Sequence, residues 1–374
     1  MNFLTLLDET NNHFIDTIDK MKQNGKPLVL FGAGFLGQMT WEFLQRQNVT
    51  IDLVALNEKY LTVDFSFNEI PVVTIEKLLA GSERYNYIIA LQVINDDVLQ
   101  PLNSSAEDML VFDPSFIGIN TEEYYSTDFC HQHSEALSAL YDELADEKSR
   151  QTMVAFINQR ICAKRRYYHA VYDSQHYFSH DVVQLKDNEV FVDAGAYTGD
   201  SVAAFMSEVD RQNVSLPQHI VACEPDSNSF AMLIQNTRHM DFCESINKGV
   251  WDKKSQLRFQ SGKAQSSRIC EENESTTIIS LDCIDDILHG GVATFIKMDV
   301  EGAELKALIG ASQTIKKYNP LLAISVYHKP NDLIAIPEYI KSLSHAYKFY
   351  LRAHHPELAF DLVLYAVPID RALS

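Results

Sequence analysis

The sequence predicts an α/β protein with two mostly parallel, doubly wound sheets, the second of which ends in an antiparallel hairpin. Short apolar runs alternate with helical patterns from residue 27 and again from residue 190, which is typical of parallel sheets. A glycine loop follows the first apolar run of each unit. Two late apolar runs, 348–355 and 360–368, are close enough to pair as a hairpin. We expect two domains, because 374 residues exceed one ordinary core.

The composition is that of a folded, acidic protein. Hydrophobic residues make up 46% and charged residues 22%, and the net charge is -20, which disfavours nucleic acid as a partner. The chain has no run of 18 apolar residues, and it starts without a basic and apolar leader. We therefore expect a cytoplasmic protein that does not bind membranes, and we predict no oligomeric state.

The cysteines predict reduced thiols, because they are scattered without any C-x-x-C pair. They are Cys130, Cys162, Cys223, Cys243, Cys270 and Cys283. The segment "CHQH" offers Cys130, His131 and His133 as metal ligands, but a closed zinc site needs about four ligands. Since no matching second cluster occurs, the sequence predicts no metal there.

Residues 1–118 form the first predicted domain, a Rossmann-like unit of the nucleotide-binding type. The runs "PLVLF", "IDLVALN" and "YNYIIALQ" are its expected strands, with helices over "QMTWEFLQRQ" and "TIEKLLAG". Gly32, Gly34 and Gly37 satisfy G-x-G-x-x-G, which permits a tight turn and close approach to a pyrophosphate. The carboxylate expected about 20 residues later is replaced by Asn57, beside Glu58. A bound nucleotide, another ligand and a packing role therefore all stay open.

Residues 119–188 are predicted to be a helical connector. Leu137, Leu140, Tyr141 and Leu144 recur at helical spacing, and Val154, Ile157 and Ile161 do so again after a cap at Asp146. Tyr177 and Phe178 lie shortly before the next strand. They either cover a ligand pocket or pack in the core.

Residues 189–374 form the second predicted domain. Its expected strands begin at "VFVDA" and continue with "HIVACEP", "ESINKGVWD", "ATFIKMD", "PLLAISVYH" and the two hairpin strands. Its expected helices are residues 200–212, "SNSFAMLIQNTR" and "EGAELKALIGASQTIKKY".

The second glycine loop, "VFVDAGAYTGDS", favours a cationic nucleoside. Asp193 at the strand tip would repel a diphosphate and attract a cationic amino-acid group. Glu224, at the end of the next strand, is where a ribose diol would lie. S-adenosylmethionine fits both charges better than NAD does.

Six motifs in order resemble the FkbM family of S-adenosylmethionine-dependent methyltransferases, which have the class I methyltransferase fold. They are "VFVDAGAYTGDS", "HIVACEPDSNSFAMLIQN", "INKGVWDKKSQLRF", "STTIISLDCIDDI", "FIKMDVEGAELKALIGASQTIKKYNPLLAISVYHK" and "FYLRAHHPELAFDLVLYAVP". The resemblance covers about residues 150–374. Residues 1–118 lie outside the usual family core, although "GAGFLG" and "EIPVVTIEKLL" resemble small domains of sugar-nucleotide enzymes.

The resemblance implies which residues hold the cofactor. Glu224 matches the acidic residue that binds the ribose hydroxyls, and Asn247 is a weaker candidate beside the adenine. The complete set expected at the cofactor is Asp193, Gly195, Tyr197, Thr198, Gly199, Ser201, Glu224, Pro225 and Asn247.

The catalytic candidates follow from the need to remove a hydroxyl proton during methyl transfer. His328 in "SVYHK" suits a base by its usual pKa, and Asp299 lies at the tip of the neighbouring strand. Asp299 and Glu301 could act as base, hold acceptor hydroxyls or bind a divalent cation, which the sequence permits without indicating. Lys297 could pair with Asp299 or cap the sheet edge. Glu304 reads as an acidic residue in the first turn of a helix.

The sequence thus predicts an O-methyltransferase whose acceptor is a sugar, glycan precursor or related metabolite, with a role in polysaccharide biosynthesis implied by the resemblance. Two alternatives stay open: an NAD- or nucleotide-sugar-dependent enzyme that uses residues 1–118, and a non-catalytic binding protein.

Overall fold

The computed structural model describes residues 2–62, 65–118, 123–260, 268–269 and 277–373. The chain divides into two compact units. The amino-terminal unit is Glu9–Phe116 with Gln159–Arg166, and the carboxy-terminal unit is Met1–Asp8, Ile117–Asn158 and Tyr167–Ser374. Residues 119–188 were predicted to be a separate connector, but they divide between the two units.

The amino-terminal unit is a five-stranded parallel sheet with strand order β3-β2-β1-β4-β5. Its strands are β1 (Leu28–Phe31), β2 (Leu53–Leu56), β3 (Val72–Thr74), β4 (Tyr85–Ile89) and β5 (Ala106–Val111). Its helices are α1 (His13–Asn24), α2 (Phe35–Arg46), α3 (Ile75–Leu79) and α4 (Asp96–Leu102), with 3₁₀ turns η2 (Glu58–Tyr60) and η3 (Pro114–Phe116). The three predicted strands are β1, β2 and β4, and their apolar side chains form the core of this unit.

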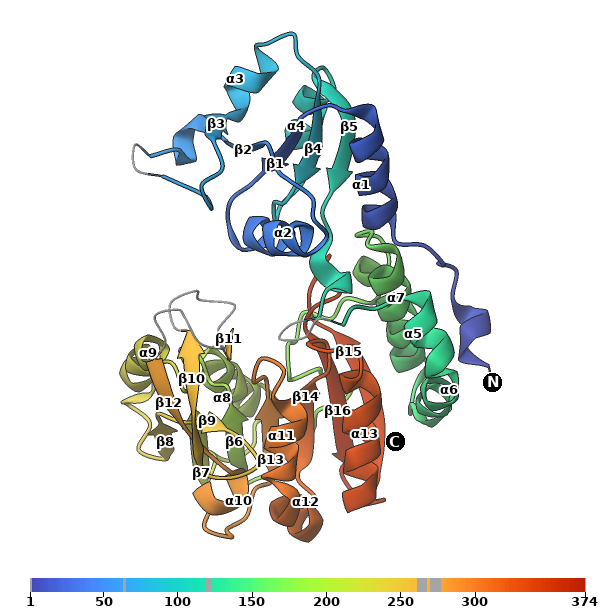
Figure 1. The fold of residues 1–374 in the computed structure, drawn as a ribbon. Helices are drawn as coiled ribbons and strands as arrows, with labels where there is room; N and C mark the ends of the chain where they lie inside the picture. The colour runs from blue at the N-terminus through green and yellow to red at the C-terminus, as the bar shows by residue number, and fades with distance from the viewer. Residues whose placement is uncertain (1, 63–64, 119–122, 261–267, 270–276, 374) are drawn as a thin grey trace. The chain divides into compact units, whose positions relative to one another are not determined.

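The carboxy-terminal unit contains a seven-stranded sheet with strand order β15-β16-β14-β13-β6-β7-β8 (Figure 1). The strands are β6 (Val190–Ala194), β7 (His219–Cys223), β8 (Cys243–Ile246), β13 (Phe295–Met298), β14 (Leu321–Ser325), β15 (Tyr347–Ala353) and β16 (Leu362–Pro368). Strand β16 pairs antiparallel with both β14 and β15, so the hairpin predicted from the last two apolar runs is confirmed. Figure 1 shows this hairpin at one edge of the sheet and β8 at the other.

The helices of this unit connect the strands. They are α5 (Thr127–Gln132), α6 (Ser134–Glu143), α7 (Glu147–Cys162), α8 (Asp200–Gln212), α9 (Ser227–Thr237), α10 (Ile284–Ile287), α11 (Glu304–Ile309), α12 (Ser312–Tyr318) and α13 (Asp332–Leu343), with 3₁₀ turns η1 (Phe3–Leu6) and η4 (Tyr168–Val171). The last turn of α7 belongs to the amino-terminal unit. Asp226 caps α9 by accepting hydrogen bonds from the backbone N–H groups of Asn228 and Ser229.

Two predicted elements are divided in the structure. The single helix expected over residues 301–318 is wrong, because the chain breaks at Gly310 into α11 and α12. A side chain at Gly310 would place its Cβ 2.0 Å from the carbonyl oxygen of Trp251, so only glycine fits where the two helices meet.

The strand expected over "ESINKGVWD" is also interrupted. It becomes β8 and the short β9 (Gly249–Val250), which pairs with β12 (Thr277–Asp282). The Asn247 amide donates hydrogen bonds to the carbonyls of Glu224 and Pro225, which turns the chain between the two strands. Strands β10 (Ser255–Gln260) and β11 (Arg268–Ile269) complete a small second sheet with order β11-β10-β12-β9 that the sequence reading did not anticipate.

The five described cysteines are free thiols, and Cys270 lies outside the described residues. Among the residues that the structure describes, none of the helices has the length and apolar character needed to cross a membrane.

The buried guanidinium of Arg352 ties α7 to strand β15. Its Nη2 lies 2.6 Å from an oxygen of Asp146, just before α7, and 3.1 Å from an oxygen of Asp181. Its Nη1 donates to the hydroxyl of Ser149 at 2.8 Å. The side chain of Arg352 is 0% exposed, so these partners replace the water that it loses on folding.

We predict that Arg352→Ala lowers the free energy of unfolding by roughly 2–3 kcal/mol, because Asp146 and Asp181 lose a shared, enclosed partner. This loss of unfolding free energy is smaller than that expected for a fully buried ion pair, since both carboxylates are partly exposed. Urea denaturation measures the change. Lys341→Ala is the matched control, because its pair with Glu143 is partly exposed on both sides, and it should cost less than about 1 kcal/mol. Equal losses for the two variants would contradict this account of Arg352.

Candidate active site

The candidate site lies at the carboxyl ends of β6, β13 and β14. Strand β6 pairs with β7 on one side and with β13 on the other, so the strand order reverses at β6. In open parallel sheets, ligands bind beyond the carboxyl ends of the strands at such a reversal. The loops after these strands carry the residues singled out in the sequence: Asp193 to Ser201, Asp299 to Glu304, and His328.

Gly195 brings the loop after β6 against the loop after β13. Its φ is 84°, and an added Cβ would lie 1.9 Å from the carbonyl oxygen of Asp299. Only glycine combines this conformation with such close approach. The predicted cofactor loop and the predicted catalytic carboxylate are therefore neighbours.

Lys297 and Asp193 form a buried ion pair across β13 and β6. The two residues are direct partners in the parallel register, and Lys297 Nζ lies 3.1 Å from Asp193 Oδ1. Lys297 Nζ also donates to the carbonyl of Gly195 at 2.7 Å and lies 4.8 Å from the centre of the Tyr177 ring. Although burial opposes it, attraction by Asp193 and then Asp299 raises the pKa of Lys297.

This pairing differs from two expectations. The sequence reading offered Asp299 as the partner of Lys297, whereas the β13–β6 register makes Asp193 the partner. Asp193 is 0% exposed, and it also accepts a short hydrogen bond from the hydroxyl of Ser201. Its charge is therefore balanced inside the sheet and is not presented to a ligand.

Glu224 stands at the end of β7 with both carboxylate oxygens oriented by backbone donors. Oε2 accepts from the N–H of Tyr197 at 2.9 Å, and Oε1 accepts from the N–H of Asp226 at 2.8 Å. Burial raises the pKa of Glu224 to about 7, and Asp226 adds to the rise, while the two backbone donors oppose it. The carboxyl of Glu224 therefore lies beside the predicted cofactor loop in a fixed orientation.

The other residues predicted at the cofactor surround this acid. Tyr197 has a positive φ of 47° and is 41% exposed, and Gly199 has a φ of 90° before α8. The carbonyl of Thr198 accepts from Asn236 at 2.8 Å. Asn247 donates to the carbonyls of Glu224 and Pro225, so its amide hydrogens hold the turn after β7.

His328 lies among carboxylates on the other side of the site. Its Nδ1 is 3.1 Å from Glu304 Oε1, and its Nε2 is 3.6 Å from both Asp299 Oδ1 and Glu301 Oε2. The imidazole and Glu304 are 0% exposed, whereas the side chain of Asp299 is 22% exposed. The three predicted residues His328, Asp299 and Glu301 are thus brought together.

The charges around His328 disfavour its predicted role as the base. Although burial opposes it, Glu304, Glu301 and Asp299 raise the pKa of His328 to about 10, so the ring is protonated at neutral pH in this arrangement. Burial also opposes ionisation of Asp299, but His328 and Lys297 outweigh it and lower the pKa of that carboxyl. Asp299 is therefore the carboxylate that is already ionised.

Three residues of this site were not predicted to act in it, and a fourth, Tyr177, was predicted there only as one of two alternatives. Glu304 was assigned to the first turn of a helix, yet its carboxylate faces His328 while accepting from the N–H of Val300. Tyr177 was left between pocket and core, and its hydroxyl donates to Asp299 Oδ2 at 2.6 Å. Asp332 and Asp361 each interact electrostatically with His328. Asp332 is the first residue of α13, and Asp361 directly precedes β16.

The glycine loop of the amino-terminal unit is a contrasting case. An added Cβ would lie 2.6 Å from the Ala90 carbonyl at Gly32 and 2.3 Å from the Gly32 carbonyl at Gly37, so packing accounts for both glycines. At Gly34 an added Cβ would meet nothing within 4 Å. No packing contact thus requires glycine there.

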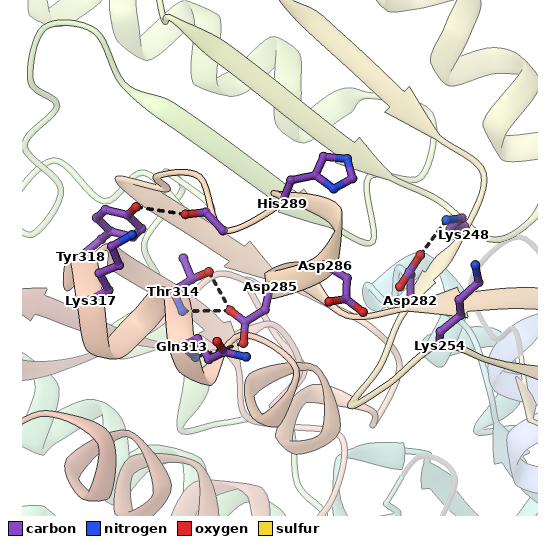
Figure 2. A pocket seen from close by; sticks show the side chains of 11 residues that line it. Lys248, Lys254, Asp282, Asp285, Asp286, His289, Gln313, Thr314, Lys317 and Tyr318 are labelled. Atoms are coloured by element: carbon purple, nitrogen blue, oxygen red, sulfur yellow. Dashed lines mark hydrogen bonds and ion pairs between the residues drawn. The ribbon is translucent and has the colours of Figure 1, made fainter.

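A cavity of about 580 Å³ lies beside α10 and α12 (Figure 2). Gly290 and Tyr318 precede β13 and β14, so this part of the cavity lies toward the amino ends of those strands. Figure 2 shows Lys248 paired with Asp282, and Asp285 held by Thr314. Its lining includes none of the residues predicted at the cofactor or as catalytic, and two of its carboxylates already have partners.

The strand order, with β16 alone antiparallel beyond β14, defines a class I methyltransferase fold. Residues 193–349 match the family model described as "Methyltransferase FkbM domain". This part of the carboxy-terminal unit is thus similar to FkbM methyltransferase domains, as the resemblance predicted.

A crystal structure of methyltransferase FkbM from Methylobacillus flagellatus KT is similar over 98% of both chains, with a TM-score of 0.73 and 22% identity. This similarity shows a shared fold that includes the amino-terminal unit. A weaker similarity is to an rRNA methylase from Streptococcus thermophilus, with a TM-score of 0.33 and 13% identity over 54% of this chain and 95% of that one. Another is to Aeropyrum pernix fibrillarin with natively bound S-adenosyl-L-methionine, with a TM-score of 0.31 and 12% identity over 50% of this chain and 70% of that one. These TM-scores are too low to bear on this chain. No curated protein matches the sequence significantly.

We predict that Lys297→Met destabilises the protein by about 3–5 kcal/mol, because Asp193 loses its buried cation. Adding Asp193→Asn should recover part of this loss, since the uncompensated charge is then removed. Urea denaturation of the two single variants and the double variant measures the coupling. Strictly additive losses would show that the two side chains are not an ion pair.

Proposed function

We propose that the carboxy-terminal unit binds S-adenosylmethionine and transfers its methyl group to a hydroxyl of a sugar or glycan precursor. The observation that carries the proposal is the placement of Glu224 beside the loop of Gly195 and Gly199, with Asp299 in contact with the same loop. The match to the FkbM methyltransferase model supports the reaction class.

The residues around Glu224 fit the nucleoside part of this cofactor. Each carboxylate oxygen accepts one backbone N–H, and a carboxylate oxygen can accept more than one hydrogen bond. Both oxygens can thus accept hydroxyls of a ribose diol while the backbone fixes their position. When bound, S-adenosylmethionine supplies an electrophilic methyl group on a sulfonium.

Asp299 is the residue that we propose for handling the acceptor hydroxyl. It is the ionised carboxylate of the site, it is partly exposed, and the Tyr177 hydroxyl fixes its orientation through Oδ2. A carboxylate in this position can accept the hydrogen bond of an alcohol and orient its oxygen for in-line attack.

The acidity of the pocket supports an alcohol as the acceptor. The ionised, partly exposed Asp299 would repel an anionic group such as a phosphate at the reacting position, whereas hydroxyl groups donate hydrogen bonds to carboxylates. A neutral polyhydroxylated acceptor such as a sugar ring suits these charges. Any phosphate that it carried would have to lie away from Asp299.

Cofactor binding should depend on Glu224. Glu224→Gln removes the charge that strengthens bonds from the ribose hydroxyls, so affinity for S-adenosylmethionine should fall roughly 10- to 100-fold in titration calorimetry. Glu244→Gln is the control, because that carboxylate lies on β8 with its side chain 60% exposed. Unchanged affinity in Glu224→Gln would sink the proposed cofactor site.

The same carboxyl gives the affinity a pH dependence. With a pKa of about 7 in the free protein, Glu224 is mostly protonated at pH 6 and mostly ionised at pH 8. The ionised form accepts hydroxyls better, so affinity should rise about tenfold from pH 6 to pH 8, with proton release on binding near pH 7. The dependence should be absent in Glu224→Gln, and its persistence there would assign it to another group.

Methyl transfer should depend on Asp299. Asp299→Asn keeps the shape but not the charge, so turnover should fall about 100-fold or more while cofactor affinity stays within about threefold. The readout is S-adenosylhomocysteine released in the presence of a panel of monosaccharides and nucleotide sugars. If the wild type bound the cofactor but no panel member raised its release, the sugar acceptor would be refuted for that panel. Equal turnover in the variant would refute the role of Asp299.

A further inference from the structure

His328 is enclosed by a group of acidic side chains. Five of them act on the ring: Asp299, Glu301, Glu304, Asp332 and Asp361. The lysines that act on this group are Lys297, on Asp299, and Lys329, on Asp332. Among these residues, carboxyl groups outnumber the groups that can carry positive charge.

Three of these side chains place ligand atoms close together. One atom each from Asp299, Glu304 and His328 lie within 4.8 Å of one another. The shortest approaches are made to different nitrogens of His328: Nδ1 lies 3.1 Å from Glu304 Oε1, and Nε2 lies 3.6 Å from Asp299 Oδ1. A cation bound to one of these nitrogens would still have one oxygen of each carboxylate within the same 4.8 Å.

Unsatisfied polar atoms in this group point to a missing partner. In the described part of the chain, neither nitrogen of His328 has a hydrogen bond of good geometry, although the ring is 0% exposed. Asp299 Oδ1 and Glu304 Oε2 are also buried without a hydrogen bond. Nδ1 lies 3.1 Å from Glu304 Oε1, but Nε2 has no contact as short in this group. Because buried polar groups are nearly always satisfied, this enclosed imidazole calls for a further ligand.

We propose that Asp299, Glu304 and His328 bind a divalent transition-metal cation of the Mn²⁺ or Zn²⁺ type. The mixed set of two carboxylates and one imidazole suits these ions better than Mg²⁺ or Ca²⁺, which favour oxygen ligands alone. The ring would be neutral in that state, with one nitrogen on the metal, and the cation would offset the surplus of carboxylates.

The backbone supports this geometry. Glu304 Oε1 accepts from the N–H groups of Val300 and Gly302, and the Tyr177 hydroxyl holds Asp299 through Oδ2. Such outer contacts orient ligands and are a regular feature of metal sites. The partly exposed side of Asp299 leaves room for further ligands from solvent or an acceptor hydroxyl, which a bound cation would polarise. Metal binding itself does not require that the proposed methyl transfer be correct.

The experiment titrates the complete chain, stripped with a chelator, with Mn²⁺ and then Zn²⁺ in the absence of cofactor. Calorimetry should show one site, and pulsed electron paramagnetic resonance of bound Mn²⁺ should show coupling to an imidazole nitrogen. Glu304→Gln and His328→Gln should each weaken binding at least roughly 100-fold, because each removes a direct ligand. The nitrogen coupling should disappear in His328→Gln.

The control is Asp286→Asn. Asp286 belongs to the other group of described residues whose ligand atoms converge, Asp282, Cys283 and Asp286, and its loss should leave Mn²⁺ affinity unchanged. Loss of binding in Asp286→Asn, or full binding in Glu304→Gln, would overturn the assignment. The assignment would also be overturned if neither metal gave a binding signal in calorimetry, or if Mn²⁺ bound without nitrogen coupling. The resonance measurement uses the wild type, so the proposal remains testable if a variant fails to fold.

Discussion

The ion pair between Lys297 and Asp193 is the constraint on which the carboxy-terminal site depends. It joins β6 to β13 where the strand order reverses, and both side chains are enclosed. Because Lys297 also donates to the Gly195 carbonyl, the same ammonium holds the start of the glycine loop. That loop contacts the backbone of Asp299 on one side and gives Glu224 a backbone donor on the other. A buried charge pair, costly to enclose, thus sets the positions of the two carboxylates with proposed roles.

The surroundings of Glu224 and of His328 differ in how their acidic side chains are stabilised. Glu224 keeps one backbone donor on each oxygen, whereas the group around His328 shares one imidazole among several carboxylates. The arrangement at Glu224 suits a neutral diol. The carboxylates around His328 are stabilised either by keeping protons or by binding a cation. This contrast explains why a residue that looks like a base by type is protonated in its actual surroundings.

The sequence was sufficient for the architecture because strand alternation and strand-end chemistry are local signals. The second strand-end acid, Glu224, and the pair of Asp299 with His328 were predicted because each ends an apolar run. The partner of Lys297 was not, since register is a property of two strands and cannot be read from one. Glu304 was missed, and Tyr177 was left open between pocket and core, for a related reason: their partners are 24 and 122 positions away. The small sheet of β9 to β12 was missed because its strands are short and interrupted.

The order of the two units along the chain has a practical consequence. The first eight residues pack with the carboxy-terminal unit, where the N–H of Phe3 donates to Ser138 and that of Asp8 donates to Asn158. The glycine-loop unit, Glu9–Phe116 with Gln159–Arg166, is therefore preceded and followed in the chain by parts of the carboxy-terminal unit. A fragment that began at residue 189 would omit Asp146, Ser149 and Asp181, and would leave Arg352 exposed at the edge of β15. A fragment that keeps these contacts must retain the segment from α5 to α7.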